Sequence, residues 1–288
     1  MDLRQLEYFV AVARHGNFGR AAEAAFVSQP ALSQQVRRLE AELGIALLRR
    51  TSRGVELTPA GADLLDRAEV ILAGVAQARG AMDEHAGVVR GAVGVAATAD
   101  ALRLPEALAA FHRDHPGVRL ALRHASAGEA LTLLRRGAVD LAVLSIGPDA
   151  ADGLDATPLA EEPLRAIAAP DDPFGGAVVR LEQLRGRAFV LAEPGTALRA
   201  IVMDACQAVG FSPVPLLEVG DPATVRFLVN AGLGVSLVPA SWLEHPGPPV
   251  VVAALTEPAP RHRLSLLAAG ELPPAGRLLA ERLRAQLG

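Results

Sequence analysis

The sequence predicts a chain of two parts, a small α+β segment and a larger α/β region, joined by one long helix. Three observations predict this organisation. The first 58 residues carry helical periodicity interrupted by short turns, residues 59 to about 85 carry one unbroken helical pattern, and from Arg90 onward short β-like runs alternate with helical ones. The 288 residues suffice for two or three domains with cores of their own.

The composition, with 51 % apolar and 21 % charged residues, is that of a soluble globular protein. The net charge of −4 does not indicate nucleic acid, but the charge is uneven: residues 1–58 carry eight arginines and six acidic residues, which leaves −6 for the rest. A basic head hints at a local anion-binding surface. The N-terminus predicts neither a signal peptide nor a membrane span, so we expect a cytoplasmic protein without a membrane partner.

The head begins with two predicted helices. The first ends at His15-Gly16, and its apolar residues fall on one stripe: Leu3, Leu6, Phe9, Val10 and Ala13. The second, roughly from Gly19 to Ala25, is short and rich in alanine, so a neighbouring helix can approach it closely.

The stretch SQPALSQQVRRLEAELG predicts a third helix after a tight turn. Ser28 suits its N-cap, Pro30 its first turn and Gly44 the position after its end. Its buried stripe is formed by Leu32, Val36, Leu39 and Leu43. The outer face carries side chains that make directed hydrogen bonds, namely Gln29, Ser33, Gln34 and Arg37.

Helix, tight turn and helix with a polar outer face is the helix-turn-helix arrangement, whose second helix fits the major groove of DNA. Glutamine pairs with adenine and arginine with guanine, and serine can contact a base or a phosphate. Two short strands, over 46–50 and 55–58, enclose Thr51-Ser52-Arg53-Gly54 as a hairpin, or wing. Arg53 at its tip, with Arg49 and Arg50 beside it, is expected to reach the backbone or a narrow minor groove.

Residues 59 to about 85 predict one long helix, with Pro59 near its start. Its apolar residues step by four and three, as in a heptad seam: Leu64, Ala68, Ile71, Val75, Ala78 and Met82. Two interpretations stay open. The seam packs within its own domain, or it packs against a second copy of the chain, which we favour.

The region after Arg90 predicts an α/β fold. Strands are expected over 93–98, 118–123, 141–145, 189–191, 216–219 and 235–238. Helices are expected near 102–115, 128–136, 197–209 and 222–231.

The first 61 residues resemble the DNA-binding domain of LysR-type transcriptional regulators, a family of bacterial proteins. The specific marks are LEYFVAVA, NFGRAAEAAFVSQPALSQQVRRLEAELG and the T-x-A-G lead into the long helix. Further on, RGAVGVAA, FHRDHPGVRLAL, LLRRGAVDLAVL and AGLGVSLVP resemble the effector domain of the family in order and spacing.

The resemblance implies a winged helix-turn-helix over 1–58, a linker and dimerisation helix over 59–88, and an effector domain over 89–288 that resembles a periplasmic binding protein. Its subdomain I would span about 90–161 and 266–288, and its subdomain II about 162–265. It also implies a homodimer, commonly assembled into a tetramer, that reads an interrupted palindromic operator in double-stranded DNA. A small-molecule effector between the subdomains would switch transcription, and RNA polymerase is a further candidate partner.

By the same resemblance, the effector site maps to strand ends and helix starts, where free N–H groups and the helix dipole favour an anion. The candidate residues are Thr98, Asp100, Ala101, Ser126, Gly128, Ser145, Glu193, Thr196, Arg199 and Gly220. Asp100 and Glu193 add negative charge where family members that sense carboxylates offer hydroxyls and amides, which leaves room for a neutral or amine-bearing effector. Arg199 could offset them. Asp221 is interpreted as a simple N-cap.

Rival functions find less support in the sequence. Gly232-x-Gly234 lacks the third glycine of a dinucleotide loop. Ser126 and Ser145 lack the first glycine of a nucleophile elbow, because His124 and Val143 occupy that position. We therefore expect no enzyme, no cofactor, no catalytic residue and no metal site. The alternatives are a cytoplasmic ligand-binding α/β protein or an enzyme with a vestigial DNA-binding head, and an exported solute-binding protein. The single Cys206 excludes a disulfide within the chain, and hence an intramolecular thiol switch, and is interpreted as buried and structural.

Overall fold

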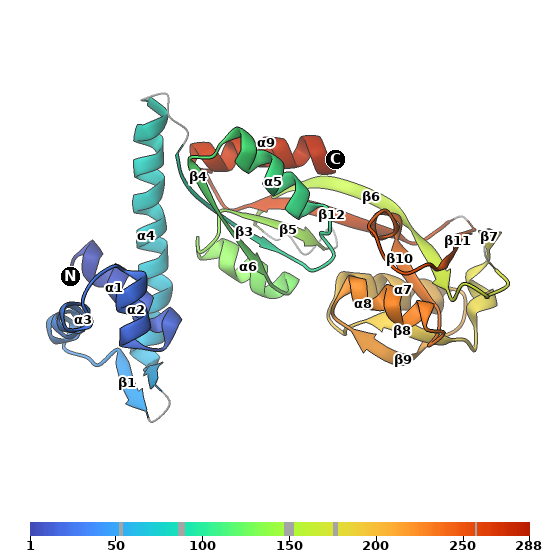
Figure 1. Cartoon of the computed structure of the whole chain (residues 1–288), viewed down its shortest axis with the longest axis horizontal. Helices are drawn as coiled ribbons and strands as arrows, with labels where there is room; N and C mark the ends of the chain where they lie inside the picture. The colour runs from blue at the N-terminus through green and yellow to red at the C-terminus, as the bar shows by residue number, and fades with distance from the viewer. Residues whose placement is uncertain (52–53, 86–89, 147–152, 175–177, 257) are drawn as a thin grey trace. The chain divides into compact units, whose positions relative to one another are not determined.

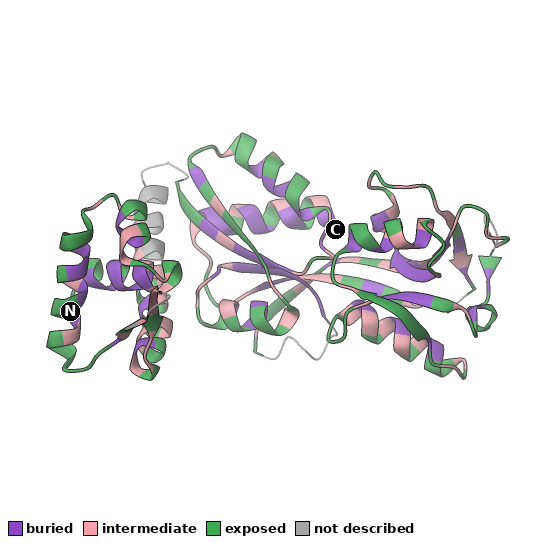
Figure 2. Ribbon diagram, turned by 60° about the horizontal axis from the view of Figure 1, so that its bottom comes forward, coloured by how far each residue is buried: buried purple, intermediate pink, exposed green. Residues whose placement is uncertain are grey.

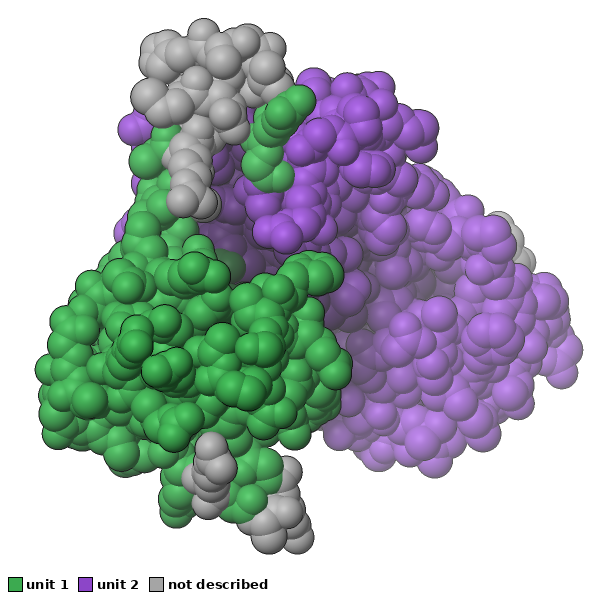
Figure 3. Space-filling view, turned by 60° about the vertical axis from the view of Figure 1, so that its left-hand side comes forward, with its two compact units in different colours: residues 1–91, 135–138 green, residues 92–134, 139–288 purple. Residues whose placement is uncertain are grey.

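A computed structural model describes residues 1–51, 54–85, 90–146, 153–174, 178–256 and 258–288 (Figure 1). For Arg50 and for residues 76–77 and 79–85, it describes the backbone alone. The contacts divide the chain into two compact units, coloured separately in Figure 3. One comprises Met1–Gly91 with Arg135–Ala138, and the other comprises Ala92–Leu134 with Val139–Gly288.

The first unit begins with the three predicted helices, α1 (Leu3–His15), α2 (Phe18–Ala24) and α3 (Gln29–Leu43). Asp2 and Gln5 form a capping box at the start of α1, and Gly16 ends it in the left-handed conformation. Gly44 ends α3 in the same way. Ser28 holds the N-cap position of α3, but its side chain makes no capping hydrogen bond there, which corrects the predicted cap.

The three helices pack on a shared core, and α3 contributes its apolar stripe to it. Leu32, Val36 and Leu39 are at most 1 % exposed. Leu32 and Val36 pack against Tyr8 and Val12 of α1 and against the alanines of α2. The small residues of α2 therefore permit the close approach that the sequence predicts.

The predicted wing is a two-stranded antiparallel hairpin of β1 (Leu48–Thr51) and β2 (Gly54–Leu57). The amide of Val55 donates to the carbonyl oxygen of Gly16 at 2.9 Å, which ties the wing to the end of α1. A Cβ on Gly54 would lie 2.6 Å from that same oxygen, and its φ of +138° also requires glycine. The tip, Ser52 and Arg53, lies outside the described residues.

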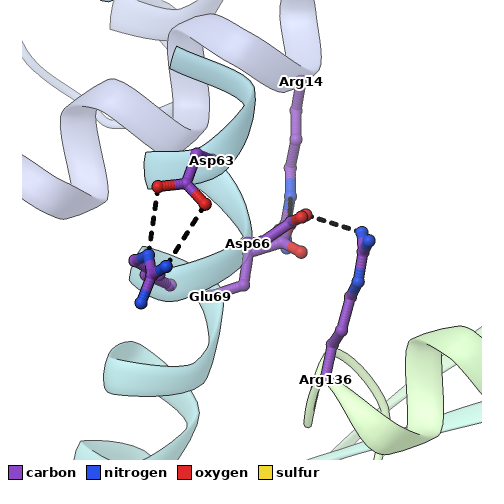
Figure 4. A network of polar contacts seen from close by, with 6 residues as sticks. Arg14, Asp63, Asp66, Glu69 and Arg136 are labelled. Carbon is purple, nitrogen blue, oxygen red and sulfur yellow. Dashed lines mark hydrogen bonds and ion pairs between the residues drawn. The ribbon is translucent and has the colours of Figure 1, made fainter. Parts of the chain in front are cut away.

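The long helix α4 spans Pro59–His85, as predicted. Its start is fixed by Thr58, whose hydroxyl accepts from the amide of Gly61 at 3.0 Å and donates to the carbonyl of Ala46 at 2.7 Å. Arg14 of α1 pairs with Glu69 of α4 at 2.8 Å within the same unit (Figure 4). The T-x-A-G sequence therefore joins the wing to the helix through specific hydrogen bonds.

The heptad seam divides between the two interpretations. Leu64 and Ala68 pack within their own domain, in a cluster with Leu6, Phe9 and Leu39. Ile71 is 41 % exposed, Val75 is partly buried and Ala78 is exposed. The backbone of Met82 continues the helix, but its side chain is not described. Only the later part of the seam is thus free for a second copy.

From β3 onward the chain alternates strands and helices, with most of the predicted ones in place. The elements are β3 (Gly91–Ala97), α5 (Leu104–Asp114), β4 (Val118–His124), α6 (Ala127–Arg135), β5 (Leu141–Ser145), β6 (Asp155–Ala168), β7 (Val178–Val179), η2 (Leu181–Leu184), β8 (Ala188–Ala192), α7 (Ala197–Ala208), β9 (Val214–Val219), α8 (Pro222–Asn230), β10 (Ser236–Pro239), η3 (Ala240–Leu243), β11 (Val251–Leu255), β12 (Arg261–Ala268) and α9 (Pro274–Leu287).

Two strands, β6 and β12, lie side by side in the middle of the main sheet of the second unit. The main sheet has the order β4-β3-β5-β12-β6-β11-β7, with β10 also paired to β6, and β8 and β9 form a separate parallel pair. The first part of β6 pairs with β12, and its last residues pair with β10 on one side and β11 on the other. β6 is buried at its end, over Ala166, Ile167 and Ala168, whereas Asp155 and Ala156 at its start are exposed; Figure 2 colours the described residues by burial.

The sequence analysis missed β6, β7, β11, β12 and α9. β6 has the sequence DATPLAEEPLRAIA, in which Pro158, Pro163 and two glutamates break the alternation typical of a strand. Pairing with neighbours on both edges overrides this weak local preference. Among the described residues, no helix is long and apolar enough to cross a membrane.

Two glycines of α4 give a matched test of this packing. A Cβ on Gly61 would lie 2.0 Å from the carbonyl oxygen of Leu47, whereas a Cβ on Gly74 meets nothing within 4 Å. We expect Gly61→Ala to lower the free energy of unfolding by about 1–3 kcal/mol through overpacking. Gly74→Ala should raise it by about 0.5–1 kcal/mol, because alanine loses less backbone entropy in a helix.

Urea unfolding followed by far-UV circular dichroism measures both changes, while the fluorescence of Trp242 follows the second unit separately. Equal effects of the two substitutions would contradict the packing of Gly61 on Leu47.

Candidate nucleic-acid interface and ligand cleft

The outer face of α3 carries the predicted polar side chains in exposed positions. Gln29, Gln34 and Arg37 are exposed, and so are Ser28 and Pro30 at the start of the helix. The Nε of Arg37 donates to the carbonyl of Ser33, one turn earlier, at 3.3 Å. That bond leaves the other guanidinium nitrogens free of any recorded partner among the described residues. The face can therefore offer donors and acceptors to base edges.

Ser33 does not share this face, which corrects the sequence interpretation. Its exposure is only 7 %. Both α1 and α2 pack on α3, so the buried stripe of α3 is wider than the i, i+4, i+7 spacing of its leucines indicates. The short serine fits where a larger side chain would separate the helices.

Phe26, in the turn between α2 and α3, is a feature that the sequence analysis missed. It is 95 % exposed and has a φ of 53°, the one non-glycine residue with positive φ among those described. Its amide donates to the carbonyl of Glu23, which holds the turn. A bulky residue is rare in this conformation, and no pattern in the sequence signals it.

In the wing, the three predicted arginines are in different situations. Arg49 pairs with Glu56 on the facing strand at 2.6 Å, so its charge is partly compensated. The side chain of Arg50 and the whole of Arg53 lie outside what the structure describes. Their expected contacts with DNA stay predictions.

The second unit contains a cavity of about 630 Å³ at the carboxyl ends of β3, β5, β8 and β9. Ligands of open α/β sheets bind at such strand ends. Eight of the ten candidate effector residues line it: Thr98, Asp100, Ser126, Gly128, Ser145, Glu193, Thr196 and Gly220.

The other two candidates lie outside the described wall of the cavity. Ala101, in the segment between β3 and α5, is 6 % exposed. Arg199 turns away, since its guanidinium pairs with Glu218 at 3.0 Å and donates to the carbonyl of Ala192 at 3.2 Å. The expected contact of these two residues with a ligand stays a prediction that the wall of this cavity does not support.

Asp100 is held by a partner that the sequence does not reveal. His262 of β12, 3 % exposed, lies with its Nε2 at 2.9 Å from one carboxylate oxygen of Asp100. Burial alone would raise the pKa of Asp100, but the hydrogen bond and the electrostatic attraction of His262 outweigh it, so the pKa is lowered. Asp100 is thus a carboxylate at neutral pH.

Three polar atoms of the cavity residues are buried without a hydrogen-bond partner in the described structure. They are the Oδ1 of Asp100, the Oγ of Ser145 and the Nε1 of Trp242. Buried polar groups are nearly always paired, so unpaired ones gathered around one cavity indicate groups awaiting a ligand or water.

The sequence analysis also missed several wall residues. His124 and Glu129 flank the predicted Ser126–Gly128 loop, and Ser236, Val238 and Trp242 come from β10 and η3. The signal for the first two was their position next to a predicted loop. Ser236 and Val238 come from a strand whose neighbours in the sheet were not recognised, and Trp242 comes from η3, so no local pattern placed these three in the wall.

Three helices begin at the cavity, and each start is capped by a side chain of the chain itself. The hydroxyl of Ser126 accepts from the amide of Glu129 at 3.3 Å, and that of Thr196 from the amide of Arg199 at 3.2 Å. Asp221 accepts from the amide of Thr224 at 2.8 Å, as its interpretation as an N-cap predicts. The hydrogen bond with Thr224 lowers the pKa of Asp221.

Cys206 lies in α7 and is fully buried, as predicted. Burial raises the pKa of its thiol to about 11. The residues that the structure describes contain no group of three or more side chains that could hold a metal ion.

The burial of Cys206 predicts an unreactive thiol in the native protein. With a pKa of about 11, roughly one molecule in a thousand carries the thiolate at pH 8. Ellman's reagent at pH 8 should therefore label the native chain far more slowly than the chain unfolded in urea. Complete labelling of the native chain at the rate of the unfolded one would contradict the burial.

Two family models match the chain. The LysR substrate binding domain matches residues 84–288, and the bacterial regulatory helix-turn-helix protein, lysR family, matches residues 3–62. Together they cover the helix-turn-helix unit and the region that holds the cavity.

Known proteins are similar over most of the chain. YnfL of Escherichia coli, an uncharacterised helix-turn-helix transcriptional regulator, is 37 % identical over 250 residues, 84 % of this chain and 83 % of that protein. OxyR of Escherichia coli, a DNA-binding transcriptional dual regulator, is 32 % identical over 294 residues, 100 % of this chain and 96 % of its own. Full-length CbnR, solved in complex with its target DNA, has a TM-score of 0.75 and 28 % identity over 99 % of this chain and 100 % of that one. With its winged helix-turn-helix and its α/β effector domain, the chain belongs to the LysR family of bacterial DNA-binding transcriptional regulators.

Proposed function

We propose that this regulator reads its operator with the exposed face of α3 and responds to a small molecule bound in the cavity of the second unit. The observation that carries the first half is the sorting of α3 into two faces. Leu32, Val36 and Leu39 are buried, while Gln29, Gln34 and Arg37 are exposed. An exposed helix face with amide and guanidinium groups matches the donor and acceptor pattern of the major groove.

The remaining contacts serve position rather than sequence. Ser28 and Pro30 lie at the start of α3, where free amides favour a phosphate. The wing arginines Arg49, Arg50 and Arg53 are assigned to the DNA backbone beside this helix. The structural similarity to CbnR in complex with its target DNA supports this orientation.

We assign dimer formation to the exposed part of α4. Val70 and Ile71 are 48 % and 41 % exposed on a helix whose earlier turns are covered by its own domain. Exposed apolar residues on a long helix favour burial against a second copy. A two-fold dimer would place its two α3 helices on an interrupted palindrome, and a tetramer would be a pair of such dimers.

Within this proposal, residues 1–58 bind DNA, 59–88 link and dimerise, and 89–288 bind the effector, with subdomains of about 90–161 plus 266–288 and 162–265. The protein acts beside its operator in the cytoplasm and not as an enzyme, and its effect on transcription makes RNA polymerase a candidate partner. An enzyme with a vestigial head is disfavoured, because the exposed polar face of α3 is intact.

Two adjacent arginines test the base-reading role. Arg37→Ala should weaken binding to an operator fragment by about 1–3 kcal/mol, and binding to random DNA by less, because a bidentate pair with guanine is lost. Arg38→Ala makes the same charge change at the next exposed position of α3 and should affect both DNAs alike.

Fluorescence anisotropy at one fixed, physiological salt concentration gives these affinities. The operator fragment is one that the wild-type protein selects from genomic DNA. If Arg37→Ala weakens binding to both DNAs equally, Arg37 contacts only phosphate, and the proposal that it reads a base is wrong.

The dimer face has its own test. Ile71→Glu should raise the dimer dissociation constant by tenfold or more, because a carboxylate would be buried in an apolar contact. Ala62→Glu, at an exposed position of α4 outside the seam, should leave it unchanged. Analytical ultracentrifugation over a range of protein concentrations measures this dissociation constant. A monomeric wild type, or an unchanged dissociation constant in Ile71→Glu, would refute the assignment.

A further inference from the structure

We propose that the effector is a small organic cation, an amine-bearing molecule with an apolar body. This inference rests on the proposed function, in which the cavity of the second unit is the effector site. It concerns the chemical class of that ligand, which follows from the charges and the unpaired atoms around the cavity.

The charged residues of the cavity wall are mostly acidic. Asp100, Glu129 and Glu193 line it, and His124 is the one basic side chain among the described wall residues. No ion pair is recorded for Glu129 or Glu193 among the described residues, and both are exposed. A low-dielectric cleft of one sign attracts a ligand of the opposite sign.

The carboxylate of Asp100 is fixed as an acceptor. His262 occupies Oδ2 at 2.9 Å, while Oδ1 is buried and has no partner. The Oγ of Ser145 is equally unpaired, and its amide lies 3.3 Å from the hydroxyl of Thr98, on the same side of the cavity. An ammonium group has three donors and no acceptor, so it can satisfy an acidic oxygen and a hydroxyl together.

Glu193 provides the second negative charge, from the opposite subdomain. Its carboxylate lies against Gly220, where an added Cβ would be 3.0 Å from both carboxylate oxygens. Arg199, which could have neutralised it, is engaged with Glu218 and the carbonyl of Ala192. Because Gly220 has no side chain, the carboxylate of Glu193 has room beside it. The charge of Glu193 stays uncompensated in the described structure.

An anionic effector would bind at the helix starts, where a side chain of the protein already accepts a hydrogen bond from one amide of each helix. Ser126, Thr196 and Asp221 each accept an amide hydrogen bond of the helix that they precede. Asp221 moreover adds a carboxylate at the start of α8. These caps reduce the number of free amides that an anion could use, and the charge of Asp221 opposes an anion at the start of α8.

The apolar body follows from the rest of the wall. Leu198, Val225, Val238 and Trp242 line the same cavity, whose volume of about 630 Å³ exceeds what an ammonium group alone requires. The unpaired Nε1 of Trp242 can donate to an oxygen or nitrogen acceptor on that body.

Three probes with one skeleton separate the charges: benzylamine, benzyl alcohol and benzoate. Their dissociation constants for the full-length wild-type chain are measured by ligand-observed NMR titration at pH 7. We expect benzylamine to bind at least about tenfold more tightly than the other two, as a charge-assisted hydrogen bond requires. Stronger binding of benzoate, or no binding of benzylamine, overturns the proposal.

Variants test where the amine binds. Asp100→Asn should raise the dissociation constant of benzylamine about tenfold or more. Glu193→Gln should raise it about two- to fivefold, and this exposed position is not expected to affect folding. Asp204→Asn, an exposed acid of α7 outside the cavity wall, is the matched control and should change nothing. Unchanged benzylamine affinity in both Asp100→Asn and Glu193→Gln overturns the assignment.

Operator binding of the same proteins separates this inference from the proposed function. If the wild type binds its operator and prefers benzoate, the charge assignment alone is wrong. If benzylamine binds in the cavity as expected but specific DNA binding is absent, the regulator function fails instead.

Discussion

The burial of one stripe of α3 is the constraint on which DNA recognition depends. Leu32, Val36 and Leu39 are held at most 1 % exposed by α1, α2 and the start of α4, so the helix cannot rotate about its axis. The opposite face, with Gln29 and Arg37, is therefore presented outward. Specific recognition needs such a rigid support, because a displacement of about an ångström breaks a bidentate pair with a base.

In the second unit, the paired strands β6 and β12 support the wall of the cavity. The two strands pair with each other along the whole of β12, and β12 supplies His262 to the carboxylate of Asp100. The wall of the cavity thus depends on a strand that contributes no residue to it. A ligand that engages Asp100 and Glu193 at once would contact both subdomains, and its binding energy would favour the arrangement in which both are within reach.

The sequence predicted the parts that depend on local patterns and not those that depend on long-range pairing. The bounds of α4 and the ends of α1 and α3 follow from periodicity, glycine and proline. Ser33 was assigned to the wrong face, because helical spacing does not tell how many helices pack on a third. β6 and β12 were missed. In β6, Pro158 and Pro163 interrupt the pattern typical of a strand, and pairing on both edges stabilises it nevertheless. The Asp100–His262 pair joins residues 162 positions apart, so no local pattern reveals it.

Footprinting of the full-length protein on the DNA upstream of its own gene tests most directly the claim that two copies of α3 read DNA. Wild type and Gln29→Ala are compared at physiological salt, where non-specific binding is suppressed. The account predicts protection of two half-sites that form an interrupted palindrome, spaced by about 10 base pairs or a multiple of that, and loss of protection in the variant. Equal protection by the two proteins would contradict base reading by α3, as would the absence of any protected site there and on genomic fragments.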